Sequence, residues 1–309
     1  FASLGCALST TVESLWFFRA LQGIGGGAGS VVARAMVRDL YEGAEAQRVM
    51  ATVQILFGIA PAIAPMIGGL LLGFHWQGIF IFLALYAAVA MFMGSKILPE
   101  TMKKNMLVPI SLSSIITRYK LLLTNKEYVL LILSLSANFS AFFIYVLASP
   151  IFLIDHLGFT TQQFGYLFIP TVTGMLIGSF IAKKTAGVVK SSSVLKYGYY
   201  FMFFVSLFNL LFCSFMPNNP LFNIGFIALY NIGMASVMPI IALAALDCFP
   251  KIRGTAASGQ AFTQMLFASV VAGFLVPILW FSTFGLSLGL SFLITFGFFT
   301  ITRTNLWKL

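Results

Sequence analysis

The pattern of hydrophobic and polar positions is dominated by long apolar runs that short charged segments separate. Residues 254–302 contain no Asp, Glu, Lys or Arg. As one helix this stretch would extend ~73 Å at ~1.5 Å per residue, enough to cross a ~30 Å hydrocarbon core twice. About 20 apolar residues are needed for one crossing. Applied to the apolar runs of the whole chain, this length predicts ten membrane-spanning helices: 1–12, 15–37, 49–74, 78–95, 128–154, 164–182, 197–216, 221–246, 256–276 and 281–301.

The basic residues support this count, because they alternate with the predicted spans. Of the 18 Lys and Arg residues, all except Arg19 lie in every second connection or at its edge. An excess of Lys and Arg marks the cytoplasmic loops of membrane proteins. The pattern therefore predicts that segment 96–127 and the C-terminus are cytoplasmic.

The composition excludes the soluble and disordered classes of protein. Hydrophobic residues make up 60% of the chain and charged residues 8%, against ~25% charged residues in an average soluble protein. The net charge of +10 comes from the short loops between spans, so it predicts no nucleic-acid partner. The chain has no H-E-x-x-H, G-x-S-x-G, phosphate-loop or metal-ligand motif, and we therefore predict neither an enzyme, an ATP-driven pump nor a metal site.

The predicted span 15–37 combines a charge with a glycine-rich face. Gly23 and Gly27 are four residues apart, which places them on one helix face and lets a neighbouring helix approach closely. Arg19 lies about one turn inside the outer boundary of this span. Two interpretations of Arg19 stay open: its side chain snorkels to the interface, or its guanidinium faces a polar cavity and influences a proton site.

The predicted span 49–74 contains two prolines four residues apart, Pro61 and Pro65, followed by Gly68 and Gly69. Each proline removes a backbone hydrogen bond and bends the helix. The small residues allow a partner helix to pack into the bend. A structural kink and a bend that seals one face of a transport path both agree with this pattern.

Polar or aromatic side chains also occur deep within several apolar spans. An amide exposed to lipid is costly, so these side chains should face the interior of the bundle. Lining of a cavity and hydrogen bonding between helices explain them equally well. The cavity candidates are Gln54, Asn138, Phe142, Tyr145, Asn231, Gln260 and Gln264.

None of the eight carboxylates falls at the middle of a predicted span, where a proton carrier is expected. Asp155, at the outer mouth, is the best remaining candidate for a gated acid, and a solvated loop acid is its alternative. Asp39 lies close in sequence to Arg34 and Arg38, so we expect these three residues to form a cytoplasmic ion cluster.

Several groups of residues resemble a known family. Arg19-x-x-Gln22-Gly23-x-Gly25 is similar to the fourth-span motif of the major facilitator superfamily. Ala64-Pro65-x-x-Gly68-Gly69 resembles the fifth-span motif of its proton-coupled drug antiporters. The stretch 27–41 resembles the Bcr/CflA drug-resistance family, and Ser149-Pro150 and Gln163-Phe164-Gly165 are similar to the second half of that family.

This resemblance implies an all-α polytopic membrane protein with the major-facilitator fold, whose ten spans correspond to spans three to twelve of twelve. It divides the chain into the remainder of an N-terminal bundle (1–95), a cytoplasmic central loop (96–127) and a six-span C-terminal bundle (128–309). Because the first span is short and residue 1 is Phe, we expect a front segment of about 60–80 residues before this chain. That segment would hold the acids that such exporters often use for proton coupling.

The function implied by the resemblance is export of small amphiphilic drugs in exchange for protons across the bacterial inner membrane. Arg19 and Asp155 are then the candidates for proton coupling, and Pro61, Pro65, Gly68 and Gly69 form the antiporter-motif helix. We expect a monomer in the lipid bilayer, with a drug and protons as partners and the proton gradient in place of a cofactor. Two alternatives stay open: a carrier of a nutrient or metabolite, and a truncated membrane fragment that does not transport.

The predicted topology can be tested with a reporter enzyme that is active only outside the inner membrane. A fusion after Leu309 should be inactive, because the basic loops place the C-terminus in the cytoplasm. A fusion at Pro217, in a connection without basic residues, should be active. An active Leu309 fusion together with a silent Pro217 fusion would reverse the predicted orientation.

Overall fold

The computed structural model describes residues 1–308 except 74, 102–110, 161, 162 and 164, and does not describe the side chains of residues 57, 58, 61, 62, 65, 66, 69, 70 and 72. This part of the chain is helical and contains no strand. Its elements are α1 Ala2–Ala7, α2 Val12–Leu40, α3 Gly43–Leu72, α4 Gln77–Ile97, α5 Leu112–Thr124, α6 Lys126–Leu147, η2 Ile151–His156, α7 Gly165–Thr185, α8 Ser191–Phe215, α9 Pro220–Asp247, α10 Arg253–Val270, η4 Val271–Leu275, α11 Val276–Leu279, α12 Thr283–Ile301 and α13 Asn305–Lys308.

By length and composition, seven helices of the described residues can cross a membrane: α4, α6, α7, α8, α9, the continuous helix formed by α10, η4 and α11, and α12. They correspond to the last seven predicted spans. Helices α2 and α3 occupy the second and third predicted spans and have 29 and 30 residues. The first predicted span contains only the six-residue helix α1, which rises ~9 Å and is too short to cross the core.

The break after α1 has a local cause. The hydroxyl group of Thr11 accepts a hydrogen bond from the backbone N–H of Ser14 at 3.2 Å, which caps the first turn of α2. The Ser14 side chain in turn accepts from the backbone N–H of Thr11 at 3.4 Å. This reciprocal cap starts a new helix where a longer first helix was predicted.

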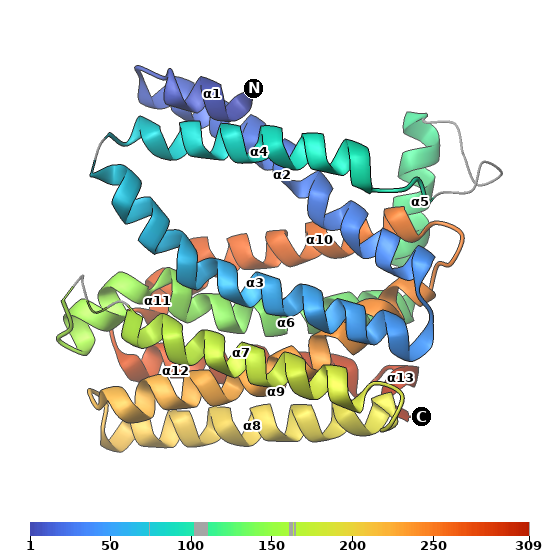
Figure 1. The fold of residues 1–309 in the computed structure, drawn as a ribbon. Helices are drawn as coiled ribbons and strands as arrows, with labels where there is room; N and C mark the ends of the chain where they lie inside the picture. Colours follow the sequence, from blue (N-terminus) through green and yellow to red (C-terminus); the bar gives the residue numbers. More distant parts are fainter. Residues whose placement is uncertain (74, 102–110, 161–162, 164, 309) are drawn as a thin grey trace.

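The second half of the chain forms the larger packed unit. Helix α9 lies at its centre, in contact with α6, α7 and α8, while α12 packs against α6 and α8 (Figure 1). The first segment of the chain consists of α1 to α4, and it meets the second half through α2 and α3. Helix α2 packs against α10, and α3 lies along α7 and α9. Helix α4 lies beside α1 (Figure 1). No residue in its most apolar stretch is buried against other parts of the described chain. Helix α5 lies inside the segment predicted as a central loop and packs on α6 and α10.

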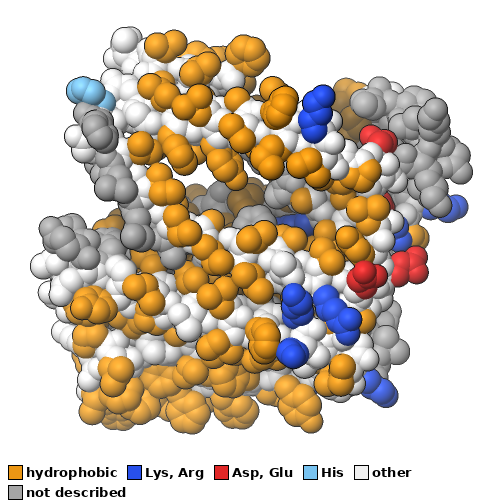
Figure 2. Space-filling view, in the orientation of Figure 1, with side chains coloured by type: hydrophobic (Ala, Val, Ile, Leu, Met, Phe, Trp, Pro, Cys, Tyr) orange, Lys and Arg blue, Asp and Glu red, His pale blue; other side chains and the backbone are white. Residues whose placement is uncertain are grey.

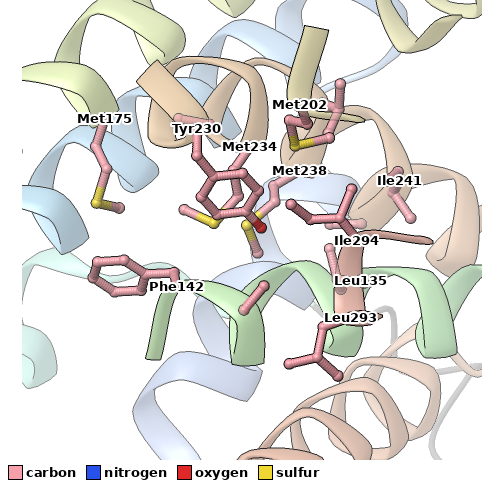
Figure 3. Packing of buried hydrophobic residues seen from close by; sticks show 14 of the residues in the cluster. Leu135, Phe142, Met175, Met202, Tyr230, Met234, Met238, Ile241, Leu293 and Ile294 are labelled. Carbon is pink, nitrogen blue, oxygen red and sulfur yellow. The ribbon is translucent and has the colours of Figure 1, made fainter. Parts of the chain in front are cut away.

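The core between α9 and α6 is built from aromatic and flexible sulfur-containing side chains. Figure 3 shows Tyr230, Met234 and Met238 of α9 beside Leu135 and Phe142 of α6. All five side chains are buried. Methionine adapts its shape to irregular gaps, so this core can change its packing without leaving voids.

Among the described residues, no helix packs closely against Gly23 and Gly27, where close packing was predicted. A Cβ atom at either position would meet no heavy atom within 4 Å. The closest approach instead involves Gly174 and Gly178, which are also four residues apart, on α7. A Cβ there would overlap the carbonyl oxygens of Ala228 and Ile232 on α9. Two glycines four residues apart do allow close helix packing here, but the tertiary fold determines which of the two glycine pairs makes the contact.

The two glycine pairs give a matched stability test. Gly178→Leu should lower the melting temperature and the folded yield in detergent, because a side chain must displace the backbone of α9. Overpacking of this kind costs about 1–3 kcal/mol. Gly27→Leu is the control and should melt as the unsubstituted chain does. Equal melting temperatures for the two variants would contradict the described contact between α7 and α9.

Candidate functional site

Four polar side chains converge between the first segment and the second half of the chain. Arg34 of α2, Gln54 of α3, and Gln260 and Gln264 of α10 line a cavity of about 10 Å³, which we call the central cavity. Its other walls are apolar: Met50, Val53, Leu135, Met238 and Ala242. A volume of this size holds about one water molecule.

The amides of the central cavity have few partners. Gln260 is fully buried, and among the described residues neither its Oε1 nor its Nε2 has a hydrogen-bond partner. The Nε2 atom of Gln54 reaches only the sulfur of Met238, at 3.8 Å. A buried polar group without a partner costs about 1–3 kcal/mol, so this arrangement is suited to a bound polar group rather than to an empty site.

Arg34 brings a positive charge to this cavity. Its Nη1 and Nη2 atoms donate to Oε1 of Gln264 at 3.3 and 3.4 Å. No carboxylate of the chain is among the residues that line the cavity. The prediction of Arg34 as a member of an ion cluster with Arg38 and Asp39 is therefore wrong, because Arg34 lies one turn before Arg38 on α2 and meets an amide.

Arg38 and Asp39 form ion pairs, but with other helices rather than with each other. Nε of Arg38 lies 2.5 Å from Oδ1 of Asp247 at the end of α9, and Nη2 lies 2.9 Å from Oδ2. Nη1 of Arg253, at the start of α10, lies 3.4 Å from Oδ1 of Asp39. Consecutive helical residues point ~100° apart, so the two charges reach different partners. We call these two contacts the crossed charge pairs.

The crossed charge pairs lie at one end of the helix bundle, which we call the charged end. Figure 2 shows that Lys, Arg, Asp and Glu gather there, while hydrophobic side chains cover most of the visible face. Nη2 of Arg48 donates to the carbonyl oxygen of Ala186 at 3.1 Å and joins α3 to the end of α7. These contacts hold α2 and α3 against the second half at this end.

A larger cavity of about 490 Å³ opens at the charged end, with Arg38, Gln47, Lys190, Ile240 and Asp247 among its lining residues. On α2 and α3, its lining residues are about one turn from those of the central cavity. Arg38 follows Arg34 by four residues, and Gln47 precedes Met50 by three. The two cavities are therefore neighbours along α2 and α3.

Cys248 follows Asp247 directly beyond the end of α9. Its Sγ atom donates to the carbonyl oxygen of Ala244 at 3.4 Å. Burial is the main cause, and the nearby charges of Glu127 and Asp247 a smaller one, that together raise the pKa of the Cys248 thiol to about 11. The thiol is therefore protonated at neutral pH and only weakly nucleophilic.

The remaining cavity candidates lie on α6 and α9, and their described hydrogen bonds do not reach the central cavity. Nδ2 of Asn138 donates to the hydroxyl of Tyr199 at 2.7 Å, and the hydroxyl of Tyr230 donates to the carbonyl oxygen of Asn138 at 2.8 Å. Nδ2 of Asn231 donates to a carbonyl oxygen of its own helix. The structure thus separates Asn138 and Asn231 from the three glutamines of the central cavity.

Tyr145 and Phe142 line a second small void, of about 10 Å³, with Leu167 and Thr171. The hydroxyl of Tyr145 accepts a hydrogen bond from Nδ2 of Asn209 at 3.2 Å. This void lies between α6, α7 and α9, away from the residues of α2, α3 and α10 that form the central cavity.

The two candidates for proton coupling lie outside both small cavities. Arg19 is exposed, and its Nη1 donates to Oε1 of Gln22 at 2.7 Å, while Nε2 of Gln22 donates to Ser3 at 2.8 Å. Asp155 is exposed in η2. The structure does not bring Arg19 and Asp155 together with the central cavity.

The antiporter-motif helix is described only in part. The backbone of α3 stays helical through positions 61 and 65, and the helix changes direction toward its C-terminal end (Figure 1). The side chains of Pro61 and Pro65, and position 69, lie outside the described set. Gly68 lies on α3 with open space where a Cβ would be.

Sequence reasoning missed the partnership of Arg34 with the glutamines. The signal was available, because Arg34 precedes Arg38 by one helical turn and so lies deeper in an apolar span. It also missed the partners of the crossed charge pairs. Asp247 and Arg253 flank the same short connection, but nothing in their spacing identifies α2 as the helix that they meet.

Comparison with known proteins adds a family and several relatives. The Major Facilitator Superfamily matches residues 1–271. A bicyclomycin resistance protein homolog of Haemophilus influenzae is 30% identical over 83% of this chain and 65% of its own length. Multidrug resistance protein D of Escherichia coli is 27% identical over 59% of this chain and 45% of its own length. Chloramphenicol resistance protein CraA of Acinetobacter baumannii is 26% identical over 57% and 43%.

A solved structure supports the same fold. The human organic anion transporter MFSD10 (TETRAN) matches 97% of this chain and 74% of its own, with a TM-score of 0.74 at 18% identity. This identity is low, so the likeness concerns the fold alone. The chain spans less than two thirds of each of the three bacterial relatives, between 43% and 65% of their lengths.

The Arg38–Asp247 pair should show measurable coupling in a double-mutant cycle of Arg38→Gln and Asp247→Asn. Because Asp247 is partly exposed, we expect a coupling free energy of only about 0.5–1 kcal/mol, which falls as salt is added. Unfolding in detergent measures it. Arg48→Gln combined with Asp247→Asn is the control cycle, with coupling near zero, since Arg48 bonds a carbonyl. Equal coupling in both cycles would contradict the described pair.

Proposed function

Because this chain belongs to the major facilitator superfamily, which consists of membrane transporters rather than enzymes, we propose that it exports small amphiphilic drugs in exchange for protons. The proposed location is the bacterial inner membrane, with the C-terminus in the cytoplasm and the protein acting as a monomer. The all-α, multi-pass fold and the resemblance to drug-resistance proteins predicted from the sequence are confirmed. The proton gradient is the proposed energy source, with no cofactor.

The observation that carries the proposal is the central cavity. It lies in the apolar part of the bundle, between helices of the first segment and helices of the second half. Its polar groups have unused hydrogen-bonding capacity, and its walls are apolar. A few polar groups among apolar walls are typical of a site for small amphiphilic molecules, and this cavity of about 10 Å³ must widen before such a molecule fits. The names of the relatives, which refer to bicyclomycin, chloramphenicol and multidrug resistance, support drugs as the substrate class.

Transport requires that the cavity open to each side of the membrane in turn. At the charged end, the crossed charge pairs and the Arg48 contact hold α2 and α3 against α7, α9 and α10. Their separation would join the central cavity to the cavity of about 490 Å³ and admit a drug from that side. The methionines in the core can then repack around substrates of different shape.

Proton coupling is assigned in this proposal to Arg19 and Asp155. The charge of Arg19 favours the ionised form of a nearby acid and so promotes proton release. Its bond to Gln22, which in turn bonds Ser3, fixes one guanidinium nitrogen and orients the group. A lysine would keep the charge but lose the planar fork.

Transport in proteoliposomes with an imposed pH gradient tests the proposal, with radiolabelled chloramphenicol as the drug. The full chain should move the drug only when the gradient is present. Arg19→Lys and Arg19→Ala should both lose most of this transport, since neither restores the planar fork. Arg303→Lys is the control, because Arg303 stacks on Phe299 far along the chain and should transport normally.

The possible results separate the parts of the proposal. Wild-type exchange by Arg19→Lys would show that charge alone suffices. Drug movement that ignores the gradient would contradict proton exchange. Transport of a nutrient or metabolite in place of the drug would identify a different carrier of the same family.

A further inference from the structure

Arg34 is a charge without an opposite partner, and this has a consequence for the ligand. We infer that the central cavity selects amphiphiles that carry an anionic or strongly electronegative oxygen and disfavours cationic ones. The inference rests on the proposed function only in taking this cavity as the substrate site. It concerns the chemistry of binding, not the coupling of transport to protons.

The negative charges of the chain can all be placed, because all eight carboxylates belong to described residues. Asp39 and Asp247 are engaged in the crossed charge pairs, and Glu127 accepts the backbone N–H of Asn305. None of the eight lines the central cavity. The cavity lining of this chain therefore carries one positive charge and no negative charge.

The other polar groups of the cavity do not neutralise this charge. The only described acceptor for Arg34 is the single amide oxygen of Gln264, which both terminal nitrogens share at 3.3 and 3.4 Å. These distances are long for charge-assisted bonds, which are usually ~2.7–2.9 Å. The guanidinium thus keeps donor capacity for a better acceptor, such as a carboxylate or sulfonate that binds both nitrogens at once.

The glutamine amides add donors around the same position. The Nε2 atom of Gln260 is buried without an acceptor, and that of Gln54 reaches only the Met238 sulfur. An oxygen anion could satisfy these donors together with Arg34. A ligand ammonium would instead face the guanidinium in a site of low dielectric constant, where repulsion is weakly screened.

The apolar walls determine the rest of the ligand. The walls are the apolar side chains of Met50, Val53, Leu135, Met238 and Ala242, two of which are flexible methionines, and the Met238 sulfur is their one described hydrogen-bond acceptor. Met238 lies with Met234 and Tyr230 in the adaptable core (Figure 3). In the present arrangement the cavity holds about one water molecule, so the ligand enters when the helices at the charged end separate.

A matched pair of probes tests this selection: naphthalene-2-sulfonate and 2-naphthylmethylammonium, which share an aromatic body and differ in charge. Their equilibrium binding to the purified full chain in detergent is measured by calorimetry, without a gradient. The unsubstituted chain should bind the sulfonate at least about tenfold more tightly, the worth of one hydrogen bond to a charged group. Arg34→Lys should keep the preference in weaker form, and Arg34→Gln should lose it.

Two further variants make the result independent of how well Arg34→Gln folds. Gln264→Glu keeps the shape of the side chain but supplies a carboxylate for Arg34, so sulfonate binding should weaken by about tenfold. Arg303→Gln removes an exposed positive charge elsewhere and should leave the preference unchanged, which controls for charge effects of the detergent.

Several results would overturn the inference: equal binding of the two probes by the unsubstituted chain, binding of neither, or an anion preference that survives both Arg34→Gln and Gln264→Glu. These results are distinct from failure of the proposed function. Gradient-driven drug export without an anion preference would refute the selection and keep the transport. An anion preference that depends on Arg34, in a chain that does not exchange protons, would support the selection and contradict the proposed proton exchange.

Discussion

The hydrocarbon core of a membrane supplies no hydrogen-bond partners, and this constraint separates scaffold from site in the described helices. In the second half, polar side chains connect helices: Asn138 donates to Tyr199, and Tyr230 donates to the backbone of Asn138. At the junction of α2, α3 and α10, Gln260 has both amide atoms buried without a described partner. Asn138 keeps one amide oxygen without a described partner but connects helices through its other groups, whereas the Gln260 side chain makes no described hydrogen bond at all.

Helix α2 carries one residue of the central cavity and one residue of the charged end, one helical turn apart. Arg34 and Arg38 are one turn apart, so one reaches Gln264 in the central cavity and the other reaches Asp247 at the end of α9. Asp39, the next residue, points toward α10 and meets Arg253. A movement of α2 that breaks these pairs must therefore also move Arg34 relative to the glutamines. Opening and ligand contact are linked by a single rigid helix.

Much of the fold could be predicted from the sequence, because hydrophobic run length and the placement of Lys and Arg are properties of single segments. The later spans follow these rules closely, and Gln260 and Gln264 face inward as the cost of exposing an amide requires. The first helix is shorter than the predicted span 1–12, because it ends at Ala7 and a local cap at Thr11 starts α2. Run length does not contain that information.

The errors at the site concern partners rather than positions. Gly23 and Gly27 have the spacing of a packing face, yet Gly174 and Gly178 make the close contact, since α9 happens to lie against α7. Arg34, Arg38 and Asp39 are neighbours in sequence, yet each meets a different residue of the second half. Which segments meet across some 200 residues of chain depends on the assembled fold and cannot be read from local spacing.

The crossed charge pairs have opposite polarity, and this determines how the membrane potential acts on the protein. On α2 the two partners are one cation, Arg38, and one anion, Asp39, and on the facing helices they are Asp247 and Arg253. The charges of Arg38 and Asp39 cancel on α2, and those of Asp247 and Arg253 cancel on the facing helices, so voltage acts on their separation only through Arg34, which the same helix carries. Arg34 has no such counterpart, and carrying one charge through the whole field changes the free energy by about 2.3 kcal/mol per 100 mV. The electric field therefore acts on the cavity charge and its ligand, not on the contacts that close the charged end.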